Sequence, residues 1–131
     1  MVVQKSKKIL IMEDDLAMRE IVSHKLSAAG FEVRAAEDGK KGLEILPPYK
    51  PDLVLMDLMM PEMDGFKVLE SIRGLPDKEL AKTHVIVLSN LWSSKDILRV
   101  KWLSVDDYLV KAYFTPDEIL GKINEVLSKN N

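Results

Sequence analysis

The sequence predicts an α/β fold in which five parallel strands form a doubly wound sheet and five helices cover its faces. Short apolar runs alternate with segments of helical periodicity along the chain. Three of the five runs, ILIM, LVLM and VIVL, are apolar throughout. Strands have this composition when helices cover them on both sides, as in a parallel sheet.

The predicted strands cover residues 9–12, 31–35, 53–56, 85–88 and 108–110. Helical spacing of apolar residues predicts five helices, over residues 15–29, 39–46, 65–73, 93–103 and 115–128. Gly30 follows the first helix at the position where a glycine commonly ends one. The clearest start signal is a capping box at the last helix, with Thr115 as N-cap, Pro116 at the first helical position and Glu118 completing the box.

Length and composition are those of one globular domain. A chain of 131 residues can bury roughly two thirds of its unfolded surface, so we expect residues 1–131 to form a single domain, with 1–6 as a flexible N-terminus. The lack of cysteine excludes disulfides, thiolate metal sites and cysteine catalysis. A net charge of −2 does not support direct nucleic-acid binding, and no apolar stretch could span a membrane. We expect a cytoplasmic protein.

Polar side chains follow four of the predicted strands. The first strand ends in Glu13-Asp14-Asp15, the third in Asp57, the fourth in Ser89-Asn90 and the fifth in Lys111. Each alone has an ordinary explanation, because an acid after a strand most often caps the next helix. Ligands of open parallel sheets bind beyond the carboxyl ends of the strands, so the coincidence of four such ends predicts a site.

The residue types at these strand ends favour a hard cation and phosphoryl chemistry. Carboxylates about 4 Å apart repel by roughly 4 kcal/mol at an effective dielectric constant near 20, and Lys111 can relieve only part of this. An all-oxygen cluster suits Mg²⁺ before Zn²⁺. Beside Mg²⁺ and a lysine, Asp57 is placed to attack phosphorus and form an acyl phosphate. His24 and His84 are interpreted as structural.

These residues resemble the receiver domain of bacterial response regulators. The matching features are Glu13-Asp14 after LIM, Asp57 in DLMMPEMDG, Ser89 after VIVL and Lys111 in DDYLVK. The resemblance covers nearly the whole chain and implies a flavodoxin-like fold of the receiver type. It also implies phosphoryl transfer to Asp57 from the phosphohistidine of a histidine kinase or phosphotransfer protein.

The resemblance further implies a role for each matching residue. Mg²⁺ would be held by Glu13, Asp14, Asp57 and the backbone carbonyl of Met59. Ser89 would hydrogen-bond the phosphoryl group and Lys111 would form its ion pair, while Tyr108 falls at the aromatic switch position. Such a protein catalyses its own phosphorylation and dephosphorylation rather than acting as a conventional enzyme.

The chain departs from the family pattern in three places. Ala112 replaces a proline whose peptide bond is usually cis, and we expect a trans bond because a non-proline cis bond costs about 2.5–4 kcal/mol. Ser104 stands where a glycine commonly ends the fourth predicted helix, which predicts a mildly strained left-handed residue. Asn90 is larger than the usual alanine, so we expect narrower access to the phosphoryl pocket.

Function is then expected to come from protein contacts. We expect a stand-alone, phosphorylation-switched receiver whose output partner docks on the face formed by the helix at 93–103, the strand at 108–110 and the helix at 115–128. The alternatives are a receiver-like module that works without phosphorylation, a Mg²⁺-dependent phosphohydrolase, and a flavin or nucleotide binder. Apolar Met59 and Leu91 predict slow loss of the phosphoryl group, because neither can orient a water.

Overall fold

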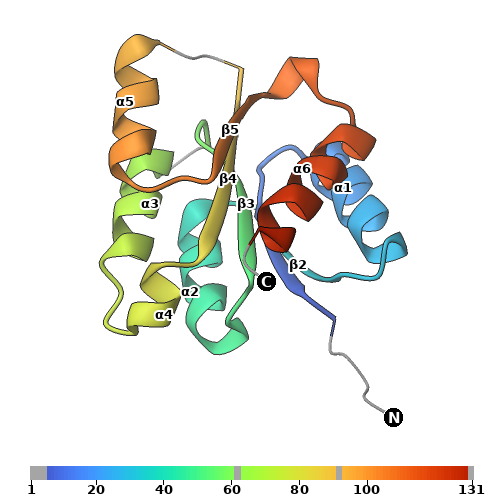
Figure 1. Cartoon of the computed structure of the whole chain (residues 1–131), viewed down its shortest axis with the longest axis horizontal. Helices are drawn as coiled ribbons and strands as arrows, with labels where there is room; N and C mark the ends of the chain where they lie inside the picture. Colours follow the sequence, from blue (N-terminus) through green and yellow to red (C-terminus); the bar gives the residue numbers. More distant parts are fainter. Residues whose placement is uncertain (1–5, 61–62, 91–92, 130–131) are drawn as a thin grey trace.

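The predicted sheet is confirmed in the computed structural model, which describes residues 6–60, 63–90 and 93–129 (Figure 1). Within these residues, five parallel strands are arranged in the order β2-β1-β3-β4-β5. They are β1 (Lys8–Met12), β2 (Glu32–Ala36), β3 (Leu53–Asp57), β4 (His84–Ser89) and β5 (Asp107–Val110). The strand order reverses direction beside β1, which leaves a crevice between the carboxyl ends of β1 and β3.

Helices cover both faces of the sheet, as expected. The α-helices are α1 (Leu16–Ala28), α2 (Gly39–Tyr49), α3 (Gly65–Arg73), α4 (Lys78–Ala81), α5 (Ser94–Trp102) and α6 (Pro116–Ser128), and a 3₁₀ turn, η1, spans Lys111–Tyr113. Figure 1 shows α1 and α6 together on one side, with α2, α3 and α5 on the other. The predicted capping box at Thr115 is present, since its hydroxyl accepts from the Glu118 N–H while the Glu118 carboxylate accepts from the Thr115 N–H.

The strands send alternate side chains into two separate cores. Ile9, Ile11 and Leu55 pack with residues of α1 and α6, whereas Leu10 and Met56 pack with residues of α2, α3 and α5. This explains why β1, β3 and β4 are apolar throughout: neither face of these strands meets water.

The helix α4, the turn η1 and the end of α2 differ from the prediction. The helix α4 was not predicted, because a single turn of four residues is too short to show helical periodicity; its N-cap is Asp77 and it buries Leu80. The helix α2 was predicted to end at residue 46 but continues to Tyr49 through Pro47 and Pro48. The two prolines lack the N–H groups that would bond to the carbonyls of Leu43 and Glu44, and burial of Tyr49 stabilises the last turn against that loss.

Arg73 joins the amino-terminal side of the sheet to three helices. Its guanidinium donates to the carbonyl oxygens of Leu103 at 2.7 Å, Thr83 at 2.8 Å, and Ala81 and Ser104 at 2.9 Å. Burial lowers the pKa of this guanidinium, yet the group retains its charge and satisfies carbonyls that the ends of α4 and α5 leave open. The end of α5 is therefore fixed to α3 and to the start of β4.

The predicted left-handed residue after α5 is also present. Ser104 has φ of 55°, and its N–H bonds to the Lys101 carbonyl while the Val105 N–H bonds to the Val100 carbonyl. This pair of bonds is a Schellman ending, which favours glycine because a Cβ is strained in that conformation.

Replacing Ser104 by glycine should therefore stabilise the protein. The Ser104→Gly variant is expected to gain about 0.5–1 kcal/mol in the free energy of unfolding, measured by urea denaturation. The matched control is Ser71→Gly, at an exposed position of α3, which should lose about 0.5–1 kcal/mol. Equal losses in both variants would show that residue 104 carries no strain.

Candidate functional site

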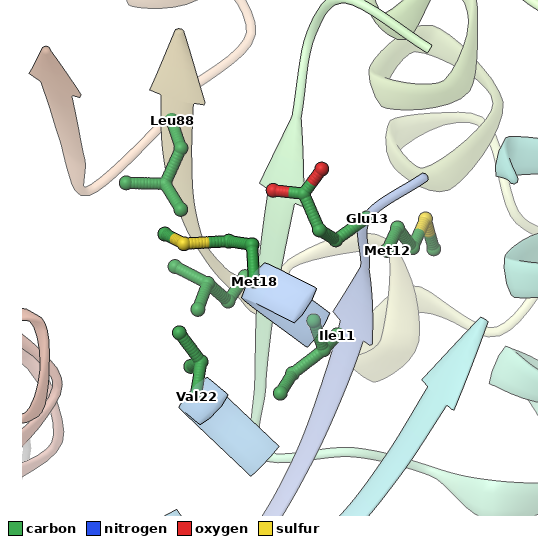
Figure 2. A pocket seen from close by; sticks show the side chains of 7 residues that line it. Ile11, Met12, Glu13, Met18, Val22 and Leu88 are labelled. Atoms are coloured by element: carbon green, nitrogen blue, oxygen red, sulfur yellow. The ribbon is translucent and has the colours of Figure 1, made fainter. Parts of the chain in front are cut away.

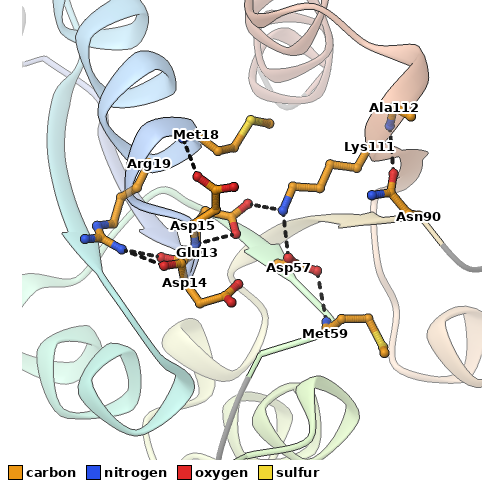
Figure 3. Close-up of polar contacts among 10 residues, drawn as sticks. All are labelled: Glu13, Asp14, Asp15, Met18, Arg19, Asp57, Met59, Asn90, Lys111 and Ala112. Carbon is orange, nitrogen blue, oxygen red and sulfur yellow. Dashed lines mark hydrogen bonds and ion pairs between the residues drawn. The ribbon is translucent and has the colours of Figure 1, made fainter.

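The polar strand ends meet at one edge of the sheet, as the sequence predicted. Figure 3 shows that Glu13, Asp57 and Lys111 point toward one another from the ends of β1, β3 and β5. The site lies just beyond the ends of the apolar strands, where the segment that follows each strand turns toward the next helix. Asp15 makes the first of these turns as the N-cap of α1, accepting a hydrogen bond from the Met18 N–H at 3.0 Å.

Lys111 lies at the centre of the site. Its Nζ is 2.6 Å from Oε1 of Glu13 and donates to Oδ2 of Asp57 at 2.9 Å, and only 18% of the lysine side chain is exposed. Burial alone lowers the pKa of the ammonium, but the bonds and ion pairs to the two carboxylates outweigh burial and raise it. The ammonium is therefore charged at neutral pH.

Glu13 is the most confined of the acids, with 2% of its surface exposed. Apolar side chains surround it, and a cavity of about 10 Å³ lies between it and Met18, Val22 and Leu88 (Figure 2). With so little water nearby, burial raises the pKa of Glu13 to about 7, although the hydrogen bonds from Lys111 and the Asp15 N–H lower it. A cation bound beside Glu13 would favour the ionised form of its carboxylate.

The acidic cluster of Glu13, Asp14 and Asp57 has the donors of a hard-metal site. Each of the three carboxylates offers one oxygen, and these oxygens lie within 4.8 Å of one another. Asp57 is 5% exposed, whereas Asp14 is open to solvent, so a cation could enter from that side. Three carboxylates against one ammonium leave an excess of negative charge, and an all-oxygen donor set of this kind fits Mg²⁺.

The turn after β3 brings the backbone of Met59 to the site. Its N–H donates to Oδ1 of Asp57 at 2.9 Å, while its side chain is 60% exposed. Gly65 closes this turn by bonding to the Leu58 carbonyl, and a Cβ at that glycine would come within 2.5 Å of the Leu58 backbone. This close approach is the physical reason for glycine in the MDG motif.

The two predicted switch residues lie on neighbouring strands. Ser89 ends β4, is 1% exposed and pairs in register with Val110 of β5. Tyr108 is half-buried and packs against the core on the α2, α3 and α5 side. Leu91, for which we predicted a part in the lifetime of the phosphoryl group, lies outside the described residues, as does Pro61 of the DLMMPEMDG motif.

Two residues beside the site were not predicted to support it. Nη1 of Arg19 donates to the carbonyl oxygen of Glu13 at 2.8 Å and lies 3.4 Å from that of Asp14, so it holds the acidic turn from α1. Oδ1 of Asn90 accepts from the N–H of Ala112 at 2.8 Å. Nothing in the sequence marks Arg19, because an arginine in the first turns of a helix is common. The expected trans bond between Lys111 and Ala112 is confirmed.

Comparisons with known proteins identify the family of this chain. The family described as response regulator receiver domain matches residues 9–124. The chain belongs to this family. The resemblance to the family noted in the sequence is thus confirmed. The matched range includes the strand ends that carry the acidic cluster, Ser89 and Lys111. The chain is accordingly a receiver of two-component signalling.

The curated relatives are longer proteins than this chain. The receiver is 36% identical over 95% of its length to the DNA-binding dual master transcriptional regulator RpaA of Synechocystis, of which it covers 50%. It is 32% identical over 93% of its length to the response regulator MprA of Mycolicibacterium vanbaalenii, of which it covers 51%. The chain spans about half the length of the curated relatives it matches.

Solved structures confirm the fold. The chemotaxis protein CheY4 of Vibrio cholerae superposes with a TM-score of 0.84 at 29% identity, covering 93% of this chain and 99% of that one. A CheY-like receiver domain protein of Methanospirillum hungatei gives a TM-score of 0.87 at 27% identity, with coverages of 95% and 96%. None of the helices in the described part of this receiver has the length and apolar character needed to cross a bilayer.

The raised pKa of Glu13 predicts how stability depends on pH in the metal-free receiver. Between the ordinary value of 4.5 and about 7, the folded protein binds a proton at Glu13 that the unfolded chain has released. Folding is therefore favoured by the proton, and the free energy of unfolding should fall as the pH rises through this window. Urea denaturation in the presence of a chelator measures it.

Glu13→Gln should reduce this decline, whereas the exposed Glu20→Gln in α1 should leave it unchanged. Added Mg²⁺ should restore stability near pH 7 in the wild type, because binding to the folded state alone is stabilising. A wild-type stability that rises through the window and is insensitive to Glu13→Gln would contradict the raised pKa.

Proposed function

We propose that this receiver accepts a phosphoryl group on Asp57 from the phosphohistidine of a histidine kinase or phosphotransfer protein, and that the reaction requires Mg²⁺. The observation that carries the proposal is the position of Asp57. Its carboxylate is nearly buried at the end of β3, held by the Met59 N–H on one oxygen and by Lys111 on the other. A carboxylate fixed on both sides presents a defined line of approach to phosphorus.

The proposed transfer is a direct displacement at phosphorus. An oxygen of Asp57 forms the new phosphorus–oxygen bond as the phosphorus–nitrogen bond to the imidazole breaks, and the imidazole nitrogen leaves with that electron pair. Lys111, which bonds Oδ2 of Asp57 at 2.9 Å, is placed to neutralise an oxygen of the incoming phosphoryl group.

The acidic cluster completes the site. Glu13, Asp14 and Asp57, together with the carbonyl of Met59, would hold the cation. Bound Mg²⁺ would neutralise charge on the transferred group, which the carboxylates alone would repel. Arg19 of α1 stabilises this arrangement, because its bonds to the backbone carbonyls of Glu13 and Asp14 orient the turn that carries both acids.

The phosphorylated receiver would signal through a protein-docking surface. We propose that Ser89 hydrogen-bonds the phosphoryl group and that the ring of Tyr108 turns inward in response, changing the face formed by α5, β5 and α6. Trp102 and Leu98 are 86% and 58% exposed on α5, so this face offers apolar surface to an output protein. A module that acts without phosphorylation would have no need of a complete Asp57, Ser89 and Lys111 set.

The direct test is incubation with acetyl phosphate and Mg²⁺, followed by intact-mass measurement. We expect one phosphoryl group on the wild-type protein and none on Asp57→Asn. The control Asp52→Asn, a half-buried aspartate at the opposite end of β3, should be labelled like the wild type. A folded wild-type protein that binds Mg²⁺ but takes up no phosphoryl group would favour the phosphorylation-independent module instead.

Removing the Lys111 ammonium should separate metal binding from phosphoryl transfer. In Lys111→Ala, Glu13 and Asp57 lose their shared partner, so their mutual repulsion grows and Mg²⁺ affinity should hold or rise. The labelling rate should fall by about 10²–10³-fold, the cost of losing a donor to the developing charge. Lys101→Ala, exposed on α5, is the control. A large loss of Mg²⁺ affinity in Lys111→Ala would contradict the assigned role.

A further inference from the structure

The 3₁₀ turn η1 begins with Lys111 and lacks an N-cap of its own. The N–H groups in the first turn of a helix have no partner within it, and Val110, the residue at the N-cap position, provides no side-chain bond. The N–H of Ala112 is one of these groups. It therefore needs an acceptor from elsewhere or from water.

Asn90 supplies that acceptor from another strand. Its Oδ1 accepts from the Ala112 N–H at 2.8 Å, as Figure 3 shows. Asparagine is a preferred N-cap residue because its short side chain carries an oxygen that reaches backbone N–H groups. Here the capping oxygen comes from a residue distant in the sequence, because Asn90 and Ala112 are 22 positions apart.

The bond joins the two strand ends that carry the proposed phosphoryl contacts. Asn90 directly follows Ser89, and Ala112 directly follows Lys111. Ser89 and Val110 form the last pair in the β4–β5 ladder, so the side-chain bond continues the connection beyond the point at which backbone pairing stops. Without it, the described contacts that hold Lys111 at the site would be the side-chain ion pairs to Glu13 and Asp57.

We propose that Asn90 is a positioning residue for Lys111: its side chain caps η1 and thereby fixes the backbone from which the lysine reaches Asp57. Residue 112 is an alanine, whose N–H can donate to Asn90, whereas a proline at this position would have no N–H to cap. The effect on reaction rate rests on the proposed function, whereas the effect on Lys111 does not.

The structural arm uses the unphosphorylated protein and two variants of Asn90. Asn90→Leu keeps the branching of the side chain but has no acceptor, while Asn90→Asp keeps an oxygen in the same place. In Asn90→Leu, hydrogen exchange at the Ala112 amide should become several-fold faster, and the NMR signal of the Lys111 Cε should move toward that of the exposed Lys101. Asn90→Asp should preserve both observations.

The control variant is Asn124→Leu, an exposed asparagine on α6, which should leave the Ala112 amide and the Lys111 signal unchanged. Asn90 is itself exposed, so none of these changes should prevent folding, and thermal unfolding checks this. An unchanged Ala112 amide in Asn90→Leu would overturn the cap. A changed amide with an unchanged Lys111 signal would overturn the positioning role.

The kinetic arm compares phosphorylation rates with acetyl phosphate and Mg²⁺. Loss of one hydrogen bond should slow phosphorylation of Asn90→Leu by about twofold to tenfold. The affinity for Mg²⁺ should not fall, because the acidic cluster, and not Asn90, would hold the metal. Failure of the wild type to be labelled would refute the proposed function but would leave the Ala112 and Lys111 measurements to decide the role of Asn90. Equal rates in Asn90→Leu and Asn124→Leu would count against the positioning role.

A further variant removes the donor instead of the acceptor. Ala112→Pro has no N–H at this position, so adding Asn90→Leu to it should change neither the Lys111 signal nor the rate further. Additive effects of the two substitutions would show that Asn90 acts by some route other than the Ala112 N–H, and would overturn the proposal.

Discussion

The ammonium of Lys111 between the carboxylates of Glu13 and Asp57 is the interaction on which the rest of the site depends. Two acids that are 2% and 5% exposed repel each other at close range when both are ionised, and a cation between them offsets part of that repulsion. The lysine provides this cation from β5, which is separated from β3 by β4. Neighbouring strands lie about 4.8 Å apart, so the long lysine side chain is what spans this gap.

The ion pairs require a rigid support, and the fold provides one. The strands that carry Glu13 and Asp57 are apolar on both faces and lie between two separate cores. Their backbones can shift only if both layers repack, so the carboxylates have fixed starting points. Lys111 is different, because it begins a short turn at the end of a four-residue strand near the surface. The bond between Asn90 and Ala112 stabilises the backbone of η1, which carries Lys111 and is less buried than the strands that lead to the acids.

Charge and burial act against each other in the acidic cluster. Burial raises the pKa of Glu13, while the ammonium and the Asp15 N–H lower it. The protonated and ionised forms of Glu13 are therefore both populated near pH 7. A divalent cation would shift this balance toward the carboxylate. Asp14 is exposed, so a cation could reach the cluster from solvent on that side.

The sequence by itself determined the sheet, both helical layers and the residues that gather at the strand ends, because apolar strands must be covered and parallel strands end at one edge. The left-handed Ser104 was expected from the resemblance, because a glycine commonly ends this helix in the family. The sequence did not determine α4, which is one turn long, or the end of α2, where the helix continues through two prolines to the buried Tyr49.

Only the tertiary structure decided which atoms pair. Lys111 pairs with both acids, Arg19 bonds to the backbone carbonyls of the acidic turn, and Asn90 bonds to Ala112. These pairs join residues on different elements, and their distances depend on sheet order and strand register, which local sequence patterns do not encode.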